Sequence, residues 1–207
     1  MTTMNIIFAR WPGDSDYKVS DQLLAEEIID DVKYRRHPNG GGLVAETAHV
    51  AETAFVGVNA IVSGCAGVYD SAQITDYARV SGNAKVLGNA WVGDRARVTD
   101  NAFVAENSRV YNDAIVLDES WVCGYAHVCG DARLYDRSRV YGETRISEHV
   151  QVSGNARVHG RSLLYGNACV RDNVDVSGDA WLFDNAELYG NMKIVSGNIK
   201  TNQGESL

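Results

Sequence analysis

The sequence predicts an all-β chain wound as a parallel β-helix, and three observations lead to this prediction. An aliphatic residue recurs at every sixth position from Val44 to Ile194 without a break. The residue four places after nearly all of these is small, and most often alanine. The two positions directly before the small residue are rich in Gly, Asn and Asp, which tolerate the left-handed backbone angles of chain corners. Two inward positions in six fit neither a helix nor an alternating strand, but they fit short strands separated by turns.

The hexads define the expected coil. Read from its aliphatic residue, each hexad approximates Val-x-Gly-Asn-Ala-x, as in residues 80–85. A fixed repeat this short is typical of a solenoid whose coils form hydrogen bonds with the coils above and below. The pattern resembles the hexapeptide-repeat, left-handed β-helix superfamily, whose triangular coils contain three hexads each. The resemblance implies roughly eight to nine three-sided coils, in which residues 18 apart are vertical neighbours.

The position of glycine within the hexad indicates which members of the superfamily the chain resembles most. Gly most often stands two places after the aliphatic residue, as in residues 152–156, whereas in the commonest family pattern Gly or an acid follows it directly. This variant resembles hexapeptide-repeat proteins of bacteria and bacteriophages more than the acyltransferases of the superfamily. A viral role, as a virion component or a factor that binds host molecules, is what this likeness implies.

We expect three segments along the chain. Residues 1–42 lack the hexad and form an N-terminal cap, residues 43–195 form the β-helix, and residues 196–207 form a polar C-terminal tail. The pattern frays after Leu188, and Ile194 begins a slip of register. The β-helix is therefore the one large folded unit.

Within the cap we predict a short strand over residues 4–9 and a helix over residues 20–36. The helix is predicted from Leu24, Ile28 and Val32, which align on one helical face at i, i+4 and i+8. A Gly-rich stretch after the helix predicts a flexible joint to the coil. The cap would cover the unpaired backbone groups of the first coil. The alternative is that it docks the coil to a partner or helps a trimer assemble.

Composition excludes several classes of function. The formal net charge is −8, and acids outnumber arginines around the repeat, which disfavours a nucleic-acid binder. No apolar run is long enough to span a bilayer, and no secretory signal opens the chain, so we expect no membrane contact. The expected location is the cytoplasm, or the host cytoplasm or virion for a phage protein. The four cysteines share no column and no metal-binding spacing, so we expect neither a disulfide nor a metal site.

Aromatic and basic residues gather in columns on two of the three faces. The residues that flank each aliphatic position point outward, where a solvated face would favour Thr, Lys and Glu. One face carries Trp91, Arg109, Tyr111, His127, Arg145 and Trp181, and a second carries Phe103, Trp121, Arg139 and Arg157. One explanation is a homotrimer interface, since the superfamily commonly forms trimers. The other is a stacking platform for a flat ligand, with Arg109, His127 and Arg145 supplying charge.

The sequence offers little for catalysis. Hexapeptide acyltransferases often carry a catalytic His on or beside a loop that interrupts a coil, and here the register has no interruption. His127 is the best placed of the five histidines to act as a general base in a trimer groove. The zinc-dependent carbonic anhydrases of the superfamily need three converging His, but no two His of this chain share a column.

The sequence therefore favours a non-catalytic scaffold or binding protein. We expect a homotrimer that presents faces or inter-subunit grooves to a protein partner or a small ligand, and we expect no cofactor. The alternative is an acyl-CoA-dependent acyltransferase whose site lies in the trimer groove.

Overall fold

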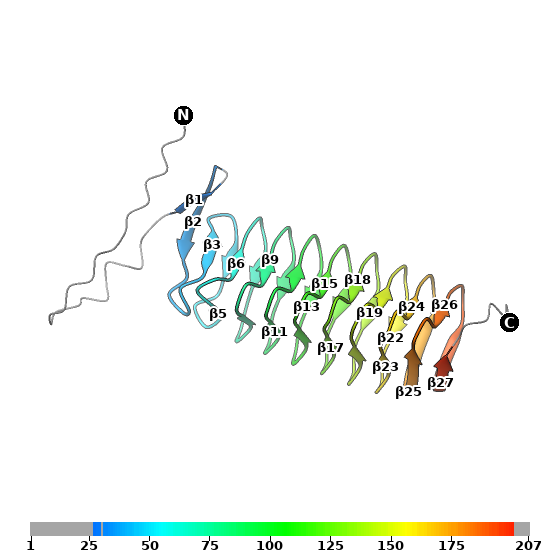
Figure 1. Cartoon of the computed structure of the whole chain (residues 1–207). Helices are drawn as coiled ribbons and strands as arrows, with labels where there is room; N and C mark the ends of the chain where they lie inside the picture. The colour runs from blue at the N-terminus through cyan, green and yellow to red at the C-terminus, as the bar shows by residue number, and fades with distance from the viewer. Residues whose placement is uncertain (1–26, 30, 201–207) are drawn as a thin grey trace.

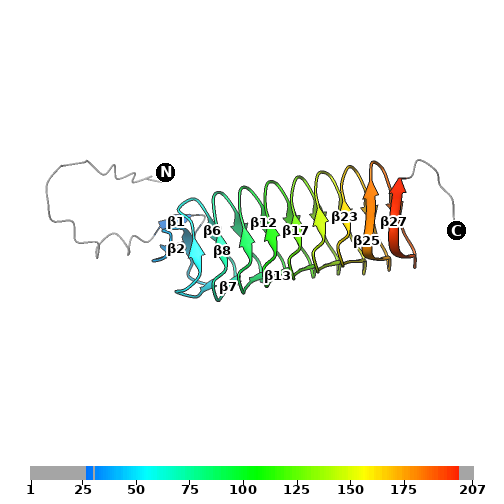
Figure 2. The same cartoon turned by 90° about the horizontal axis from the view of Figure 1, so that it is seen from below.

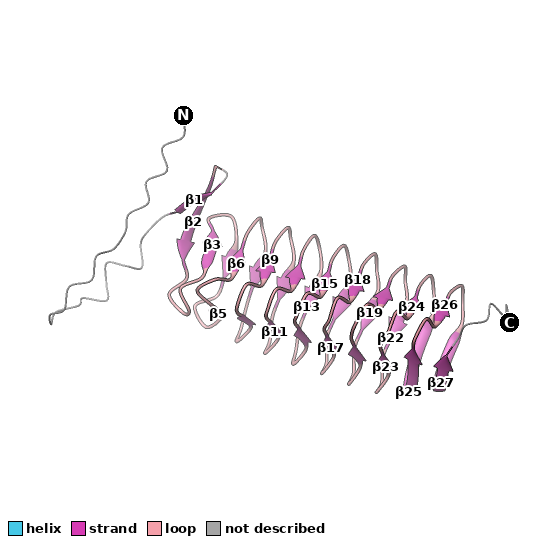
Figure 3. Cartoon of the chain, viewed as in Figure 1, coloured by secondary structure: helices cyan, strands magenta, loops and turns pink. Residues whose placement is uncertain are grey.

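The chain forms an elongated, three-sided left-handed coil, seen from two sides in Figures 1 and 2. The computed structural model describes residues 27–29 and 31–200. Strands and turns alone make up this part of the chain, as Figure 3 shows by colour. No helix among the described residues has the length and apolarity needed to cross a bilayer. The predicted β-helix is thus confirmed.

Nearly every hexad contributes a strand of two residues, one outward and one inward, and the strands stack into three faces. Face A consists of β3 (Leu43–Ala45), β6 (Ile61–Val62), β9 (Arg79–Val80), β12 (Arg97–Val98), β15 (Ile115–Val116), β18 (Arg133–Leu134), β21 (Gln151–Val152), β24 (Cys169–Val170) and β26 (Glu187–Leu188). Face B consists of β4 (His49–Val50), β7 (Gly67–Val68), β10 (Lys85–Val86), β13 (Phe103–Val104), β16 (Trp121–Val122), β19 (Arg139–Val140), β22 (Arg157–Val158) and the start of β25 (Asp175–Phe183). Face C consists of β5 (Phe55–Val56), β8 (Gln73–Ile74), β11 (Trp91–Val92), β14 (Arg109–Val110), β17 (His127–Val128), β20 (Arg145–Ile146), β23 (Leu163–Leu164) and the end of β25.

Vertical neighbours along each face are 18 residues apart. Val80 of β9 lies opposite Val98 of β12, and the same parallel register continues to Val116 of β15. The three-hexad coil predicted from the sequence is therefore confirmed.

The core is a column of stacked aliphatic side chains with small residues at its corners. Val104, Val122 and Val140 stack on face B and are fully buried, and so is the corner residue Ala126. Burying one Val side chain stabilises the fold by roughly 1.5–3 kcal/mol, and the gain recurs three times in every coil.

The C-terminal coil slips in register, as predicted. Strand β27 (Lys193–Lys200) pairs with β25, and Ile194 lies opposite Val176 at the usual spacing of 18. Beyond a bulge, Ile199 lies opposite Leu182, a spacing of only 17. The slip lets Ile199 take the inward place that the strict hexad would give to the next residue.

The N-terminal segment corrects the predicted helix. Residues Glu27–Ile29 (β1) and Val32–Arg36 (β2) form an antiparallel hairpin, so the helix over residues 20–36 is wrong from residue 27 onward. Strand β2 pairs antiparallel with β3, the first strand of face A. The open backbone edge of the first coil provides hydrogen bonds that an isolated helix would not use. The predicted strand over residues 4–9 and the first part of the helix lie outside the described residues.

The Gly-rich stretch after β2 is packed against the coil, contrary to the predicted flexible joint. The N–H of Gly42 donates to the carbonyl of Val56 at 2.8 Å, and the N–H of Val56 donates to the carbonyl of Asn39 at 3.0 Å. A Cβ on Gly40 would lie 2.3 Å from the Val56 carbonyl oxygen, so only glycine permits this approach. His37 is 1% exposed beneath this stretch.

Candidate binding faces

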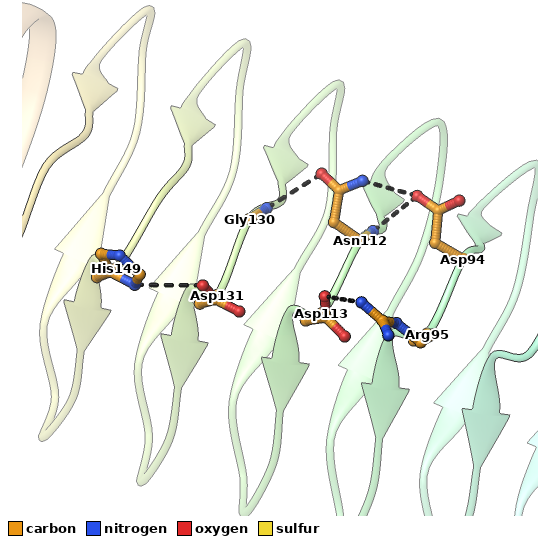
Figure 4. A network of polar contacts seen from close by, with 7 residues as sticks. All are labelled: Asp94, Arg95, Asn112, Asp113, Gly130, Asp131 and His149. Atoms are coloured by element: carbon orange, nitrogen blue, oxygen red, sulfur yellow. Dashed lines mark hydrogen bonds and ion pairs between the residues drawn. The ribbon is translucent and has the colours of Figure 1, made fainter.

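From Gly64 to Gly190, each corner of the coil contains one residue with a left-handed backbone angle. Gly fills some of these places, and elsewhere a residue with an acceptor side chain does, such as Asp94 with φ 54°. Figure 4 shows that Asp94 Oδ2 accepts the backbone N–H of Asn112 one coil on, at 2.9 Å, and Asn112 Oδ1 accepts the N–H of Gly130 at 3.3 Å. A similar bond to the next coil is made by Asp70, Asp76, Asp100, Glu106, Asp118, Asp136, Glu148 and Asp172. These carboxylates therefore hold the coils together.

The outermost corner residues also pair from one coil to the next. The ion pairs are Arg95–Asp113 at 2.8 Å, Glu119–Arg137 at 3.1 Å and Arg161–Asp179 at 2.8 Å. The carboxylate of Asp131 also lies 3.3 Å from Nδ1 of His149, and Figure 4 shows this contact together with Arg95–Asp113. Two shallow hollows of about 420 and about 370 Å³ lie at corners and are lined by the first two pairs together with neighbouring acids. Because their polar side chains already bind each other, these hollows leave little for a ligand.

Charge is segregated between corners and faces. Across residues 43–193, the outward face positions hold ten Lys or Arg and two acids, whereas the corner positions hold seventeen acids and three Arg. The face cations are Arg79, Lys85, Arg97, Arg109, Arg133, Arg139, Arg145, Arg157, Arg171 and Lys193, and the face acids are Asp175 and Glu187. The acidic net charge therefore conceals three basic faces, each bordered by acidic edges.

Face C carries an indole that lies flat on the coil. A Cβ built on Gly93 would lie 2.4 Å from Cζ2 of Trp91, so the indole covers this glycine directly. The Nε1–H of Trp91 donates to Oγ1 of Thr75 at 2.9 Å, which fixes the ring in place. The ring of Tyr111 packs beside it, with centroids 5.6 Å apart. Trp91 thus offers a half-buried aromatic platform.

Beside this platform three basic side chains follow one another on adjacent strands. Arg109, His127 and Arg145 occupy one column, and no acid lies on face C among residues 43–193. Burial lowers the pKa of His127, and the two flanking guanidinium groups lower it further. A hydrogen bond with Cys129, followed by burial, raises the pKa of Tyr111 to about 12. Near neutral pH the column therefore presents two cations around a neutral imidazole.

Face B carries rings that stand on edge and stack along the column. Phe103 and Trp121 have centroids 4.7 Å apart, and the guanidinium of Arg139 lies 5.6 Å from the indole on the next strand. In the neighbouring column Tyr141 and His159 stack at 4.7 Å. Trp121 is 45% exposed, but Phe103 and Arg139 flank it along the column, so its edge rather than an open ring face meets solvent.

The structure places the predicted residues in the expected columns and separates them between two faces. Trp91, Arg109, Tyr111 and His127 form one contiguous group on face C together with Arg145. Trp181 lies two strands beyond Arg145, 46% exposed, with Leu163 between them. Phe103, Trp121, Arg139 and Arg157 form one continuous column on face B.

Sequence reasoning missed the structural use of the acids and the platform built by Gly93. Counting the charged residues at each position of the hexad would have shown that cations lie on the faces and acids at the corners, because the repeat fixes which positions are faces and which are corners. The flat placement of Trp91 had a signal in the small residue two places later, where most faces carry a larger side chain. Within residues 27–29 and 31–200, no three His, Cys, Asp or Glu gather closely enough to hold a metal ion.

The repeat and the coil together define the class of protein. The chain folds as a left-handed β-helix built from a hexapeptide repeat. A family model described as YdcK Beta solenoid repeat matches residues 78–94, about one coil.

Among solved structures, the chain is similar to the UDP-N-acetylglucosamine acyltransferase from Campylobacter jejuni, with 17% identity over 69% of this chain and 68% of that chain and a TM-score of 0.33. It is also similar to the Arabidopsis UDP-N-acetylglucosamine acyltransferase, with 14% identity over 78% of this chain and 71% of that chain and a TM-score of 0.43. Likeness at this level says nothing about the activity of this chain. No curated protein matches it.

Proposed function

We propose that this protein is a non-catalytic binding scaffold whose face C holds a flat, negatively charged group of a small ligand or a protein partner. One observation carries the proposal: the indole of Trp91 lies flat over Gly93, beside two guanidinium groups without an acidic partner among the described residues. The flat ring would stack on the indole, and Arg109 and Arg145 would bind the negative charge. No loop interrupts the coil between residues 43 and 193 to enclose a reaction, which favours binding over catalysis.

The test uses 1-anilinonaphthalene-8-sulfonate, a flat aromatic anion, as the ligand. We expect saturable binding that weakens about tenfold or more in Trp91→Ala and in the double variant Arg109→Gln/Arg145→Gln. The matched control is Arg97→Gln/Arg133→Gln, because these two arginines have the same two-strand separation on face A but no flat indole beside them. Equal losses in both double variants, or binding unchanged in Trp91→Ala, would refute the face C site.

We further propose that the scaffold is a homotrimer. The exposed indole of Trp181 on face C supports it, because large aromatic side chains are enriched at protein interfaces. Light scattering after size-exclusion chromatography measures the mass directly. A monomer at high protein concentration would remove this part of the proposal.

A second candidate, acyl transfer from acyl-CoA, keeps one observation in its favour. A general base must be neutral before it accepts a proton, and His127 meets this condition because its pKa is lowered. A thermal-shift screen with coenzyme A, acetyl-CoA and nucleotides separates the two candidates. A rise of several degrees with acetyl-CoA that is lost in His127→Gln would favour the enzyme, and no shift with any of these compounds would favour the scaffold.

A further inference from the structure

Face B offers a binding surface independent of face C. Arg139 and Arg157 stand on adjacent strands below the exposed Trp121. Both guanidinium groups are exposed, and neither has an ion pair or hydrogen-bond partner among residues 27–29 and 31–200. The single acid of this face, Asp175, binds His159 instead, at 2.9 Å.

Asp175 lies beside Arg157 on the next strand of face B and binds His159, and the other acids near these arginines are held at the corners. Asp136 Oδ2 accepts the backbone N–H of Gly154 at 2.9 Å, and Glu119 pairs with Arg137 at 3.1 Å. A corner carboxylate that turned toward face B would give up these contacts. The two guanidinium groups are therefore available to a negatively charged partner from outside the chain.

The shape of the basic surface limits what can bind it. The face is two outward residues wide, which corresponds to roughly 7 Å for residues two apart on a strand. Acids border it on both sides of Arg139, where Asp136 and Glu143 occupy the two corners, and on one side of Trp121, whereas the corners beside Arg157 carry no acid. A nucleic-acid duplex or a membrane surface would extend over both edges and meet like charge. A single extended chain that runs along the coil axis fits between them.

The arrangement of the rings argues against single-stranded nucleic acid. Such strands bind through bases that stack on open aromatic faces. Along face B, Trp121 is flanked by Phe103 and Arg139, and Tyr141 stacks on His159. What remains outward is the apolar edge of the indole beside two planar guanidinium forks, and this fork matches a carboxylate in two parallel hydrogen bonds.

We propose that face B, over Trp121, Arg139 and Arg157, is a docking surface for an extended acidic peptide segment of a partner protein. Carboxylates of the segment bind the two guanidinium groups, and an apolar side chain packs against the exposed edge of the indole. The acids on both sides of Arg139 keep the segment on the basic strip there. This surface does not depend on the face C site.

The experiment measures fluorescence anisotropy of a fluorescein-labelled peptide that alternates Glu and Leu, titrated with the full chain at low salt. We expect binding that weakens as salt is added, and that falls by about tenfold or more in Arg139→Gln/Arg157→Gln. The matched control is Arg79→Gln/Arg97→Gln, two arginines on adjacent strands of face A without an indole above them. We expect the control to bind within about twofold of the unmodified chain.

Three outcomes would overturn the docking surface. The first is no binding of the Glu–Leu peptide, or equal binding of the same peptide with Gln in place of Glu. The second is an equal loss in the two double variants, which would indicate unspecific attraction to any basic face. The third is tighter binding of an oligothymidylate or a sulfated glycan through Arg139 and Arg157, or a fall in mass from trimer to monomer in Arg139→Gln/Arg157→Gln. Tighter binding would assign the face to another class of ligand, and the fall in mass would assign it to the contact between subunits.

Discussion

Replacing Gly93 by Ala tests the flat platform of face C. The φ angle of Gly93 is not positive, so alanine fits the backbone, and the conflict lies in the side chain alone. The added Cβ would stand 2.4 Å from Cζ2 and 2.8 Å from Cε2 of Trp91, distances that real Cβ atoms do not show. The indole must therefore lift away and release its hydrogen bond to Thr75.

The cost of this movement follows from three contributions. The lost hydrogen bond destabilises the fold by roughly 0.5–1.5 kcal/mol. Uncovering roughly 50 Å² of apolar ring surface adds about 1 kcal/mol. Replacing Gly by Ala also lowers the conformational entropy of the unfolded chain, which stabilises the fold by roughly 0.4–1 kcal/mol. We expect a net loss of about 1 kcal/mol in the free energy of unfolding.

The assay is tryptophan fluorescence in a chain where Trp11, Trp121 and Trp181 are replaced by Phe, so that Trp91 alone emits. We expect Gly93→Ala to shift the emission to longer wavelength and to increase quenching by iodide. Gly57→Ala, in the same column, is the control, because its Cβ would meet no atom closer than 3.5 Å. An unchanged emission in Gly93→Ala, or an equal change in both variants, would refute the flat placement of the indole.

Three further predictions concern the core, a corner and a histidine. Val122→Ala removes a fully buried side chain between Val104 and Val140 and should lower the free energy of unfolding by about 2 kcal/mol in chemical denaturation; a loss below about 0.5 kcal/mol would contradict the stacked core. Asp136→Ala should cost more than Asp136→Gly, by about 1 kcal/mol, because φ is 58° there and only Gly adopts this angle freely; equal stabilities would contradict the corner geometry. The folded pKa of His127 is lowered, so the unfolded chain takes up its proton first, and stability falls as pH drops through the ordinary range near pH 6.5. In His127→Gln the free energy of unfolding should fall less between pH 7.5 and pH 5.5 than in the unmodified chain. An unchanged dependence of stability on pH would refute the lowered pKa of His127.

The strict hexad made the coil predictable, whereas the cap had no repeat to guide the interpretation. Leu24, Ile28 and Val32 fit a helical stripe by local spacing, and local spacing says nothing about the free edge of β3 in space. That edge pairs with β2 and decides the conformation of the segment. Asp31, with φ 63°, occupies the turn of the hairpin, where the sequence alone suggested an acid inside a helix.

The composition of the binding faces was predictable, but their electrostatic character was not. The repeat assigns Trp91, Arg109 and His127 to one column from residue numbers alone. The net charge of −8 nevertheless suggested an acidic surface, because a sum over the chain does not record that acids such as Asp136 bind backbone N–H groups at corners. The orientation of each ring also lies beyond the pattern, since Trp91 lies flat and Trp121 stands on edge for reasons set by neighbouring side chains.

The most direct test of this account maps a bound acidic peptide by nuclear magnetic resonance. The Nε–Hε signals of the arginines and the backbone amide signals of the corners are followed while the Glu–Leu peptide is added to the labelled chain. We predict that the signals of Arg139 and Arg157 move, while the amide of Gly154, held by Asp136, stays in place. Movement confined to corner amides, or an equal movement of every arginine on all three faces, would contradict the claim that acids are held at the corners and cations are free on the faces.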